Sequence, residues 1–256
     1  MNTDSVRAKK RLGQHFLKDI TIAQQIVDSL SDDTNAVLEI GPGMGILTQF
    51  ILKKTIPDVL VVEIDPESVH YLRNHYPDLE QKIIEDDFLR MDLSVLFSDK
   101  FSIIGNFPYG ISSQILFRVL EYKDHIPELV GMFQKEVAVR IASLPGRKEY
   151  GILSVLLQAF YRVEYLFSVD ACMFNPPPKV TSAVVRLQRN AVCDLGCDEQ
   201  KFKMLVKTAF NQRRKTLRNS LKTISFTDGF IQEDIFNKRP EQLSVNEFIC
   251  LTNEMK

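Results

Sequence analysis

The chain of 256 residues has no tryptophan, only four cysteines and almost no net charge. Lys and Arg total 32 and Asp and Glu total 33, so the formal charge of -1 does not by itself indicate a nucleic-acid partner. The N-terminus is polar, and no apolar run approaches the roughly 18 residues that a membrane span needs. We therefore expect a cytoplasmic protein with no membrane partner.

The cysteines indicate neither a disulfide framework nor a metal site. Only Cys193 and Cys197 lie close together, and no nearby histidine completes a zinc-ligand spacing. We expect reduced thiols and no metal. With 45% hydrophobic and 25% charged residues, the composition is that of a soluble globular protein and excludes collagen-like or largely disordered chains.

Short apolar runs alternate with segments of helical periodicity between residues 35 and 189. This alternation predicts an α/β domain with a seven-stranded, mostly parallel sheet that helices cover on both faces. The predicted strands are residues 36–40, 59–63, 81–84, 101–104, 129–134, 163–169 and 182–187. The predicted helices between them are residues 47–54, 67–74, 112–121, 135–142 and 151–161.

The composition changes after residue 190, where residues 191–200 are polar and no β-branched run follows. Apolar side chains then recur at helical spacing, which predicts a small C-terminal α-helical domain. These side chains are Phe202, Leu205, Val206, Ala209 and Phe210, continued by Leu217 and Leu221. The predicted domains are therefore residues 1–190 and 191–256.

A glycine-rich turn follows the first predicted strand of the sheet and precedes a helix. Glycines let a strand turn sharply and let the backbone approach a ligand, so Gly41 and Gly43 are predicted cofactor contacts. The spacing Gly41, Gly43, Gly45 differs from the dinucleotide fingerprint and argues against a nicotinamide cofactor. The alternative is a turn with no ligand, and the sequence of the turn alone weighs the two about equally.

Acidic residues at the ends of the next two predicted strands favour the cofactor. Glu63 ends the second strand, where a carboxylate can accept both hydroxyls of a ribose. Asp87 follows the third strand and could accept from an adenine amino group, while Phe88 could cover the ring. Taken singly, acidic strand ends are usually solvated, but their coincidence with the glycine turn points to an adenosyl ligand.

The turn Asn106-Phe107-Pro108-Tyr109 follows the fourth predicted strand, at the edge where open α/β sheets bind ligands. Its chemistry suits methyl transfer to an exocyclic amine. Hydrogen bonds from the amine to the Asn106 side-chain oxygen and the Phe107 carbonyl would favour a pyramidal nitrogen whose lone pair points at the donor. Tyr109 would stack on the base. The alternative is an ordinary turn in which Pro108 fixes φ.

Five blocks of the sequence closely resemble the KsgA (RsmA) family of ribosomal RNA adenine dimethyltransferases. The blocks span residues 9–17, 39–45, 106–109, 174–180 and 210–215. The resemblance implies a Rossmann-like class I methyltransferase fold with S-adenosylmethionine as methyl donor. It places six residues in contact with that cofactor, namely His15, Leu17, Gly41, Glu63, Asp87 and Asn106. It also places Tyr109 and Phe174 around the target adenine, whereas the sequence alone favours a core position for Phe174.

Positive charge is concentrated in two places despite the balanced total. Eight cations without an intervening acid lie between residues 201 and 222, and a second group lies at the N-terminus. Clustered cations are typical of phosphate contact, although a solvated helix face is the usual alternative. The predicted RNA-binding residues are Arg213, Arg214, Lys215 and Arg218, together with Lys9, Lys10 and Arg11.

The resemblance implies dimethylation of N6 on two adjacent adenines near the 3′ end of small-subunit (16S) ribosomal RNA. The expected partner is that RNA in a pre-30S particle during late assembly, and the enzyme is expected to be a monomer. Two alternatives remain open: a large-subunit (23S) dimethyltransferase that confers macrolide resistance, and an assembly factor that binds RNA without turnover. A nicotinamide oxidoreductase is more distant, because of the glycine spacing.

Overall fold

The computed structural model describes residues 6–256, which form two compact units. One unit contains the chain up to Ala138 together with Glu164–Arg189, and the other contains Val139–Val163 and Asn190–Lys256. The break after Arg189 lies next to the predicted boundary at residue 190. Residues 139–163 differ from the prediction, because they group with the C-terminal unit rather than with the sheet.

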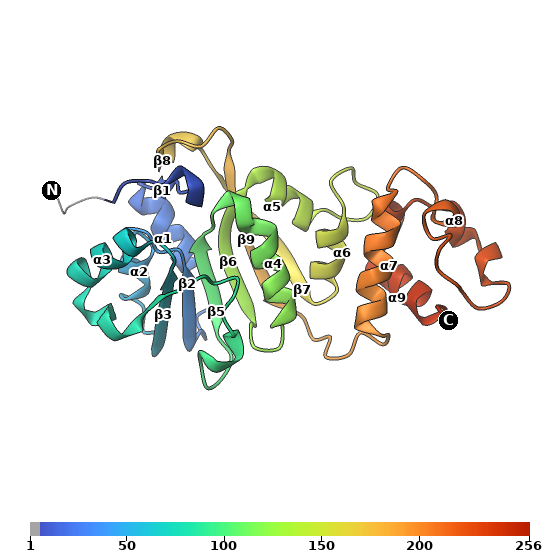
Figure 1. The fold of residues 1–256 in the computed structure, drawn as a ribbon, viewed down its shortest axis with the longest axis horizontal. Helices are drawn as coiled ribbons and strands as arrows, with labels where there is room; N and C mark the ends of the chain where they lie inside the picture. Colours follow the sequence, from blue (N-terminus) through green and yellow to red (C-terminus); the bar gives the residue numbers. More distant parts are fainter. Residues whose placement is uncertain (1–5) are drawn as a thin grey trace. The chain divides into compact units, whose positions relative to one another are not determined.

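A seven-stranded sheet forms the centre of the first unit, in the order β4-β3-β2-β5-β6-β9-β7 (Figure 1). Its strands are β2 (Ala36–Ile40), β3 (Asp58–Glu63), β4 (Ile83–Glu85), β5 (Ser102–Asn106), β6 (Glu128–Gln134), β7 (Tyr161–Val169) and β9 (Ser182–Arg189). The pairs β2-β3, β2-β5, β3-β4 and β5-β6 are parallel, and β6-β9 is antiparallel. The mostly parallel seven-stranded sheet is confirmed.

The α-helices up to residue 142 lie before β2 or between strands of the sheet, and the last of them belongs partly to each unit. They are α1 (Ile20–Asp28), α2 (Thr48–Ile51), α3 (Pro66–His75), α4 (Ser112–Glu121) and α5 (Lys135–Ala142). Helices α1 and α2 share a buried apolar cluster with one face of the sheet, to which Val37, Val61 and Val130 belong. Strand β2 is buried at all five residues, as expected for a central parallel strand covered on both faces.

A two-stranded antiparallel pair joins the N-terminal segment to the end of the same unit. Strands β1 (Phe16–Leu17) and β8 (Phe174–Asn175) pair with Leu17 opposite Phe174 (Figure 1). Neither short strand nor α1 appears in the sequence-based assignment. The pair matters for the site, because it lays residues 10–17 beside the carboxyl ends of the parallel strands.

The C-terminal unit contains α6 (Ile152–Gln158), α7 (Glu199–Asn211), α8 (Leu217–Ser220) and α9 (Val245–Asn253), with three short 3₁₀ helices at Phe230–Gln232, Asp234–Asn237 and Pro240–Gln242. Aromatic contacts link three of its segments: the rings of Tyr150 and Phe210 are tilted with centroids 6.3 Å apart, and those of Phe210 and Phe248 are stacked with centroids 6.1 Å apart. The unit is helical, as the apolar spacing predicts.

Two sequence-based assignments in this unit are wrong in detail. Leu217 and Leu221 do not continue the helix of Phe202, because α7 ends at Asn211 and a turn precedes α8. The helix predicted over 151–161 ends at Gln158, and β7 begins at Tyr161. Within residues 6–256, no helix is both long enough and apolar enough to span a membrane.

Candidate active site

A cavity of about 490 Å³ opens at the carboxyl ends of the parallel strands. Its walls come from the turn after β2, the ends of β3 and β5, the loop after β4, and residues 10–16 of the N-terminal segment. A second hollow of about 330 Å³ shares Phe16, Gly41 and Asn106 with it. This is the edge at which open α/β sheets bind ligands, beside the point where the strand order reverses.

The glycine turn is shaped for a ligand on one side and packed on the other. A Cβ on Gly41, which has a φ of 66°, would meet no atom within 4 Å, and this residue lines the cavity. A Cβ on Gly45 would lie 2.5 Å from the ring of Tyr76, whose hydroxyl donates to the Gly45 carbonyl at 3.0 Å. The turn therefore exposes bare backbone to the cavity, as the sequence predicts for a cofactor loop.

Glu63 ends β3 at the wall of the cavity with 4% of its surface exposed. Its Oε2 accepts from the Gly43 N–H at 3.1 Å and its Oε1 from the Asp65 N–H at 2.9 Å. Burial raises the pKa of this carboxyl, while the two backbone hydrogen bonds oppose the shift. Because a carboxylate has about four lone-pair sites, Glu63 keeps capacity to accept from ribose hydroxyls.

The loop after β4 contributes the opposite end of the cavity. Asp87 lines it, and its Oδ1 accepts from the Leu89 N–H at 3.0 Å. Phe88 is buried and also lines the cavity. Ile64, which the sequence does not single out, lines the same cavity with 49% of its surface exposed. An exposed aliphatic side chain beside a buried carboxylate suits the flat face of a base.

Asn106, at the end of β5, has a defined orientation. Its Nδ2 donates to the backbone carbonyl of His15 at 2.9 Å. Because a carbonyl oxygen can only accept, the amide nitrogen must face the N-terminal segment, which leaves Oδ1 available as an acceptor. The orientation is the one that the predicted contact with an exocyclic amine requires.

Tyr109 is held at two points beside Asn106. Its ring stacks on the imidazole of His15, with centroids 5.5 Å apart, and its hydroxyl hydrogen-bonds to Ser182 Oγ of β9. Burial raises the pKa of the Tyr109 hydroxyl. The His15 Nδ1 in turn lies 2.8 Å from the carbonyl oxygen of Pro176. Of the predicted cofactor contacts, His15 thus lies in the cavity wall against Tyr109 and Asn106.

Phe107 and Pro108 complete the turn after β5. The Phe107 ring is fully buried against Gly105 and Gly131, so its side chain packs the turn in addition to the carbonyl role predicted for it. The Pro108 carbonyl accepts from Ile111 N at 3.2 Å and Ser112 Oγ at 3.4 Å. With that carbonyl engaged, the Phe107 carbonyl remains the better candidate acceptor for an amine.

Phe174 and Leu17 lie apart from the main cavity. Phe174 is 1% exposed, belongs to the buried apolar cluster and does not line the cavity, so the structure does not support a stacking role for it. Its position is the core position that the sequence alone favours. Leu17 lies opposite it in β1 and lines only the smaller hollow.

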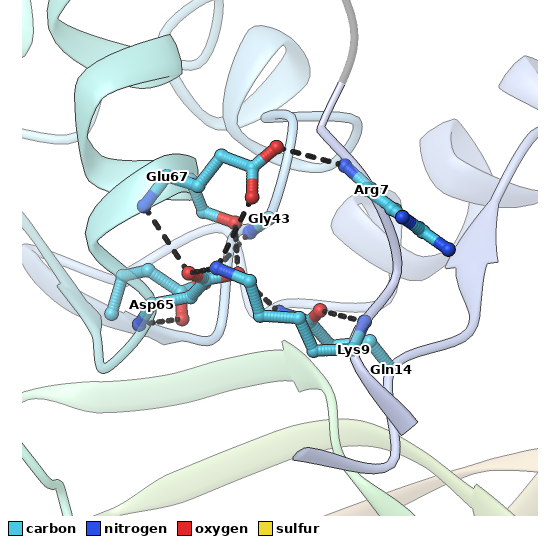
Figure 2. A network of polar contacts seen from close by, with 8 residues as sticks. Arg7, Lys9, Gln14, Gly43, Asp65 and Glu67 are labelled. Atoms are coloured by element: carbon cyan, nitrogen blue, oxygen red, sulfur yellow. Dashed lines mark hydrogen bonds and ion pairs between the residues drawn. The ribbon is translucent and has the colours of Figure 1, made fainter. Parts of the chain in front are cut away.

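Among the N-terminal cations, the environment of Lys9 differs from that of Lys10 and Arg11. Lys9 forms ion pairs with Asp65 and with Glu67, the second at 3.2 Å, as Figure 2 shows. These contacts raise the pKa of Lys9, chiefly through the hydrogen bond to Asp65. Lys10 and Arg11 are exposed and line the cavity rim. The structure therefore places Lys9 in an internal ion-pair network rather than free for phosphate.

The C-terminal cations are similarly divided. Arg213 donates to the Lys148 carbonyl and lies 3.8 Å from Glu241, within the same unit. Arg214 and Lys215 are exposed, and Arg218 lies 3.5 Å from Asn237 Oδ1. Arg214 and Lys215 are thus the more accessible members of the predicted RNA-binding group.

Two further residues of the site were missed from the sequence. Gln14 donates to Asp65 Oδ2 at 3.1 Å and accepts from the Lys9 N–H at 2.8 Å, and Asp65 is completely buried. Gln14 lies inside the matched block 9–17, whereas Asp65 lies outside the matched blocks, two residues after Glu63. No group of three or more His, Cys, Asp or Glu in residues 6–256 is arranged to hold a metal ion.

The sheet, the glycine turn and the Asn106 turn define a Rossmann-like class I methyltransferase. Residues 5–254 match the family described as ribosomal RNA adenine dimethylase, and the chain belongs to this family. It is accordingly an rRNA adenine dimethyltransferase.

Named relatives match along nearly the whole chain. The chain is 62% identical over 254 residues to "Ribosomal RNA small subunit methyltransferase A" of Bacteroides thetaiotaomicron, which covers 98% of this chain and 95% of the relative. The protein of the same name from Cytophaga hutchinsonii is 57% identical, and the match covers 98% of this chain and 98% of the relative.

Solved structures agree with the fold. A dimethyladenosine transferase from Plasmodium falciparum superposes with a TM-score of 0.79 at 25% identity, covering 93% of this chain and 96% of its own. The 23S rRNA methyltransferase ErmE superposes with a TM-score of 0.68 at 25% identity, and the match covers 93% of this chain and 99% of ErmE.

Proposed function

We propose that this protein transfers methyl groups from S-adenosylmethionine to the N6 atoms of two adjacent adenines near the 3′ end of 16S ribosomal RNA. The names of the relatives at 57–62% identity support the small subunit as target. The observation that carries the chemistry is the Asn106 amide, whose nitrogen is engaged by His15 and whose oxygen is left for an amine.

Residues of the cavity fit an adenosyl cofactor. The open space at Gly41 would receive the cofactor without a Cβ in the way, and Glu63 offers acceptor sites to ribose hydroxyls. Asp87 and Ile64 lie where an adenine edge and face would need an acceptor and an apolar surface. A cavity of about 490 Å³ is within the range of small-molecule sites. When bound, S-adenosylmethionine supplies an electrophilic methyl group on a sulfonium.

The protein's part in the transfer is to orient the nucleophile. The N6 lone pair of adenine is delocalised into the ring, so the amine needs to become pyramidal before it attacks. Asn106 Oδ1 and the Phe107 carbonyl would accept its two N–H groups and hold the lone pair toward the methyl donor. Tyr109, fixed by His15 and Ser182, would hold the plane of the base. No strong general base is needed, because the methylated nitrogen loses its proton readily.

We further propose that the RNA is bound as part of a pre-30S particle, by one monomer in the cytoplasm. The exposed cations Lys10, Arg11, Arg214 and Lys215 are the candidates for phosphate contact. Extraction of a base from a folded RNA costs unstacking energy, which phosphate contacts can offset.

The test uses labelled S-adenosylmethionine with small and large subunits purified separately from cells that lack these methylations. We expect label in small-subunit RNA, as N6,N6-dimethyladenine at two adjacent positions. Label confined to large-subunit RNA would overturn the target. The Asn106→Ala variant should lose transfer while it still binds S-adenosylhomocysteine, and full activity in that variant would refute the mechanism.

A further inference from the structure

We propose that Asp65 is a positioning residue that clasps the N-terminal segment shut over the cofactor cavity, with Lys9 and Gln14 as its partners. The inference rests on the proposed cofactor, and it assigns Lys9 to this clasp rather than to RNA. Residues 10–16 form one wall of the cavity, and the clasp fixes that wall to the start of α3 (Figure 2).

The Asp65 carboxylate collects donors from two parts of the chain. As the N-cap of α3, its Oδ1 accepts from the Glu67 N–H at 3.2 Å, and its Oδ2 lies 3.5 Å from Ser68 Oγ. From the N-terminal segment, Lys9 Nζ donates to Oδ1 and Gln14 Nε2 donates to Oδ2 at 3.1 Å. With the side chain 0% exposed, loss of the two distant donors would leave a buried carboxylate short of partners.

The segment side of the clasp is closed on itself. The Lys9 N–H donates to Gln14 Oε1 at 2.8 Å, so Lys9, Gln14 and Asp65 form a ring of contacts. Glu67 adds a second acceptor, which lies 3.2 Å from Lys9 Nζ and receives the Arg7 N–H at 3.1 Å. Figure 2 shows these residues converging from the N-terminal segment and from the start of α3. The ring spans the bend at residues 10–13 that faces the cavity.

The clasp is also connected to the proposed ribose contact. The Asp65 N–H donates to Glu63 Oε1, and Glu63 Oε2 accepts from Gly43 of the glycine turn. One continuous set of hydrogen bonds therefore runs from Lys9 through Asp65 and Glu63 to the turn. A change in the position of the segment would disturb the same carboxylate that the ribose needs.

Charge on both partners favours the closed arrangement at neutral pH. Burial of Asp65 opposes ionisation, but the hydrogen bonds from Lys9 and Gln14 outweigh it and hold the pKa of Asp65 below its usual range. Hydrogen bonding from the Arg7 N–H and from Lys9 lowers the pKa of Glu67. Lys9 thus lies between two ionised carboxylates, whereas its neighbour Lys10 is exposed at the cavity.

The test compares Lys9→Met, which removes the ammonium and keeps the aliphatic stem, with Lys9→Arg and with the control Lys100→Met, which changes an exposed lysine outside the cavity. Binding of S-adenosylhomocysteine is measured by calorimetry without RNA. We expect the dissociation constant to rise about fivefold to tenfold in Lys9→Met and to stay near wild type in Lys9→Arg and Lys100→Met. In turnover, the KM for S-adenosylmethionine should rise in Lys9→Met while kcat at saturating cofactor stays within about twofold.

A second readout needs no cofactor. Trypsin cleavage after Arg11 requires the segment to leave its place, so it should be faster in Lys9→Met than in wild type and Lys100→Met. Equal cleavage and equal S-adenosylhomocysteine affinity would overturn the clasp, even in a protein that methylates rRNA. A raised KM for RNA with unchanged cofactor affinity would make Lys9 an RNA contact and would also overturn it. Failure of the wild type to bind S-adenosylhomocysteine would instead overturn the proposed cofactor, while the cleavage comparison would still decide whether Lys9 restrains the segment.

Discussion

Alanine at position 131 would place a Cβ only 2.0 Å from Cε2 of the Phe107 ring. Gly131 of β6 lies directly opposite Gly105 of β5 in the parallel register, and the ring occupies the space that the two missing side chains leave. Phe133 closes the socket, with its ring centroid 4.9 Å from that of Phe107. An ordinary contact begins near 3.4 Å, so the ring has to move by about 1.4 Å.

We expect Gly131→Ala to destabilise the protein by about 1 to 3 kcal/mol, the usual cost of overpacking a core. For a chain of this size the melting temperature should fall by about 2 to 12 °C. Because Phe107 lies between Asn106 and Pro108, its displacement also moves the catalytic turn, and kcat should fall about tenfold to hundredfold. Thermal unfolding and single-turnover methylation measure the two effects.

Two further variants identify the cause. Gly110→Ala lies in the same turn, but its Cβ would meet no atom within 4 Å, so it should melt within about 1 °C of wild type. Phe107→Leu in the Gly131→Ala background removes ring atoms from the socket and should restore part of both losses. If Gly131→Ala melts and turns over like wild type, or if the double variant shows no recovery, then Gly131 does not position the Phe107 ring.

Three other outcomes are expected. Burial and the charge of Glu63 raise the pKa of Glu39 to about 8, against the opposing hydrogen bond from Thr48. The contribution of Glu39 to stability is therefore complete below about pH 4.3 and is lost as the pH rises through about 8. Glu39→Gln should accordingly gain stability relative to wild type as the pH rises from about 4.3 to about 8 in urea unfolding, and a difference that stays constant over this window would contradict this. Arg214→Glu and Lys215→Glu should each weaken rRNA binding and reduce its salt slope by about 1, without lowering the melting temperature; an unchanged slope would exclude them from the interface. Arg213→Glu should lower the melting temperature as well, because it loses its contacts with Lys148 and Glu241; melting at the wild-type temperature would contradict this.

The strands of the sheet could be predicted because buried parallel strands are short apolar runs with clear ends. The run at 36–40 coincides with β2, and the helices at 112–121 and 135–142 coincide with α4 and α5. The apolar spacing of Ala23, Ile26 and Val27 after the N-cap Asp19 also indicates α1, although the assignment overlooked it.

Side-chain partners distant in sequence could not be predicted. Lys9 belongs to a basic cluster in the sequence, and its acid partner Asp65 lies 56 residues away. Phe174 belongs to a motif that the resemblance places at the substrate, yet its strand pairs with Leu17 and buries the ring. The Phe107 socket likewise depends on a glycine in a different strand. Each case is decided by packing between segments, which local patterns do not record.

The N-terminal wall of the cavity has a consequence for the order in which the protein matures during synthesis. His15 is synthesised 161 residues before its partner Pro176, and β1 has no partner until Phe174 and Asn175 have emerged from the ribosome. Residues 10–16 are therefore the first part of the cavity wall to be synthesised, but they cannot be held in place until β8 has been made. A nascent chain can form β2 to β5 and the glycine turn well before that point, so the complete cavity appears only after Pro176 has been translated.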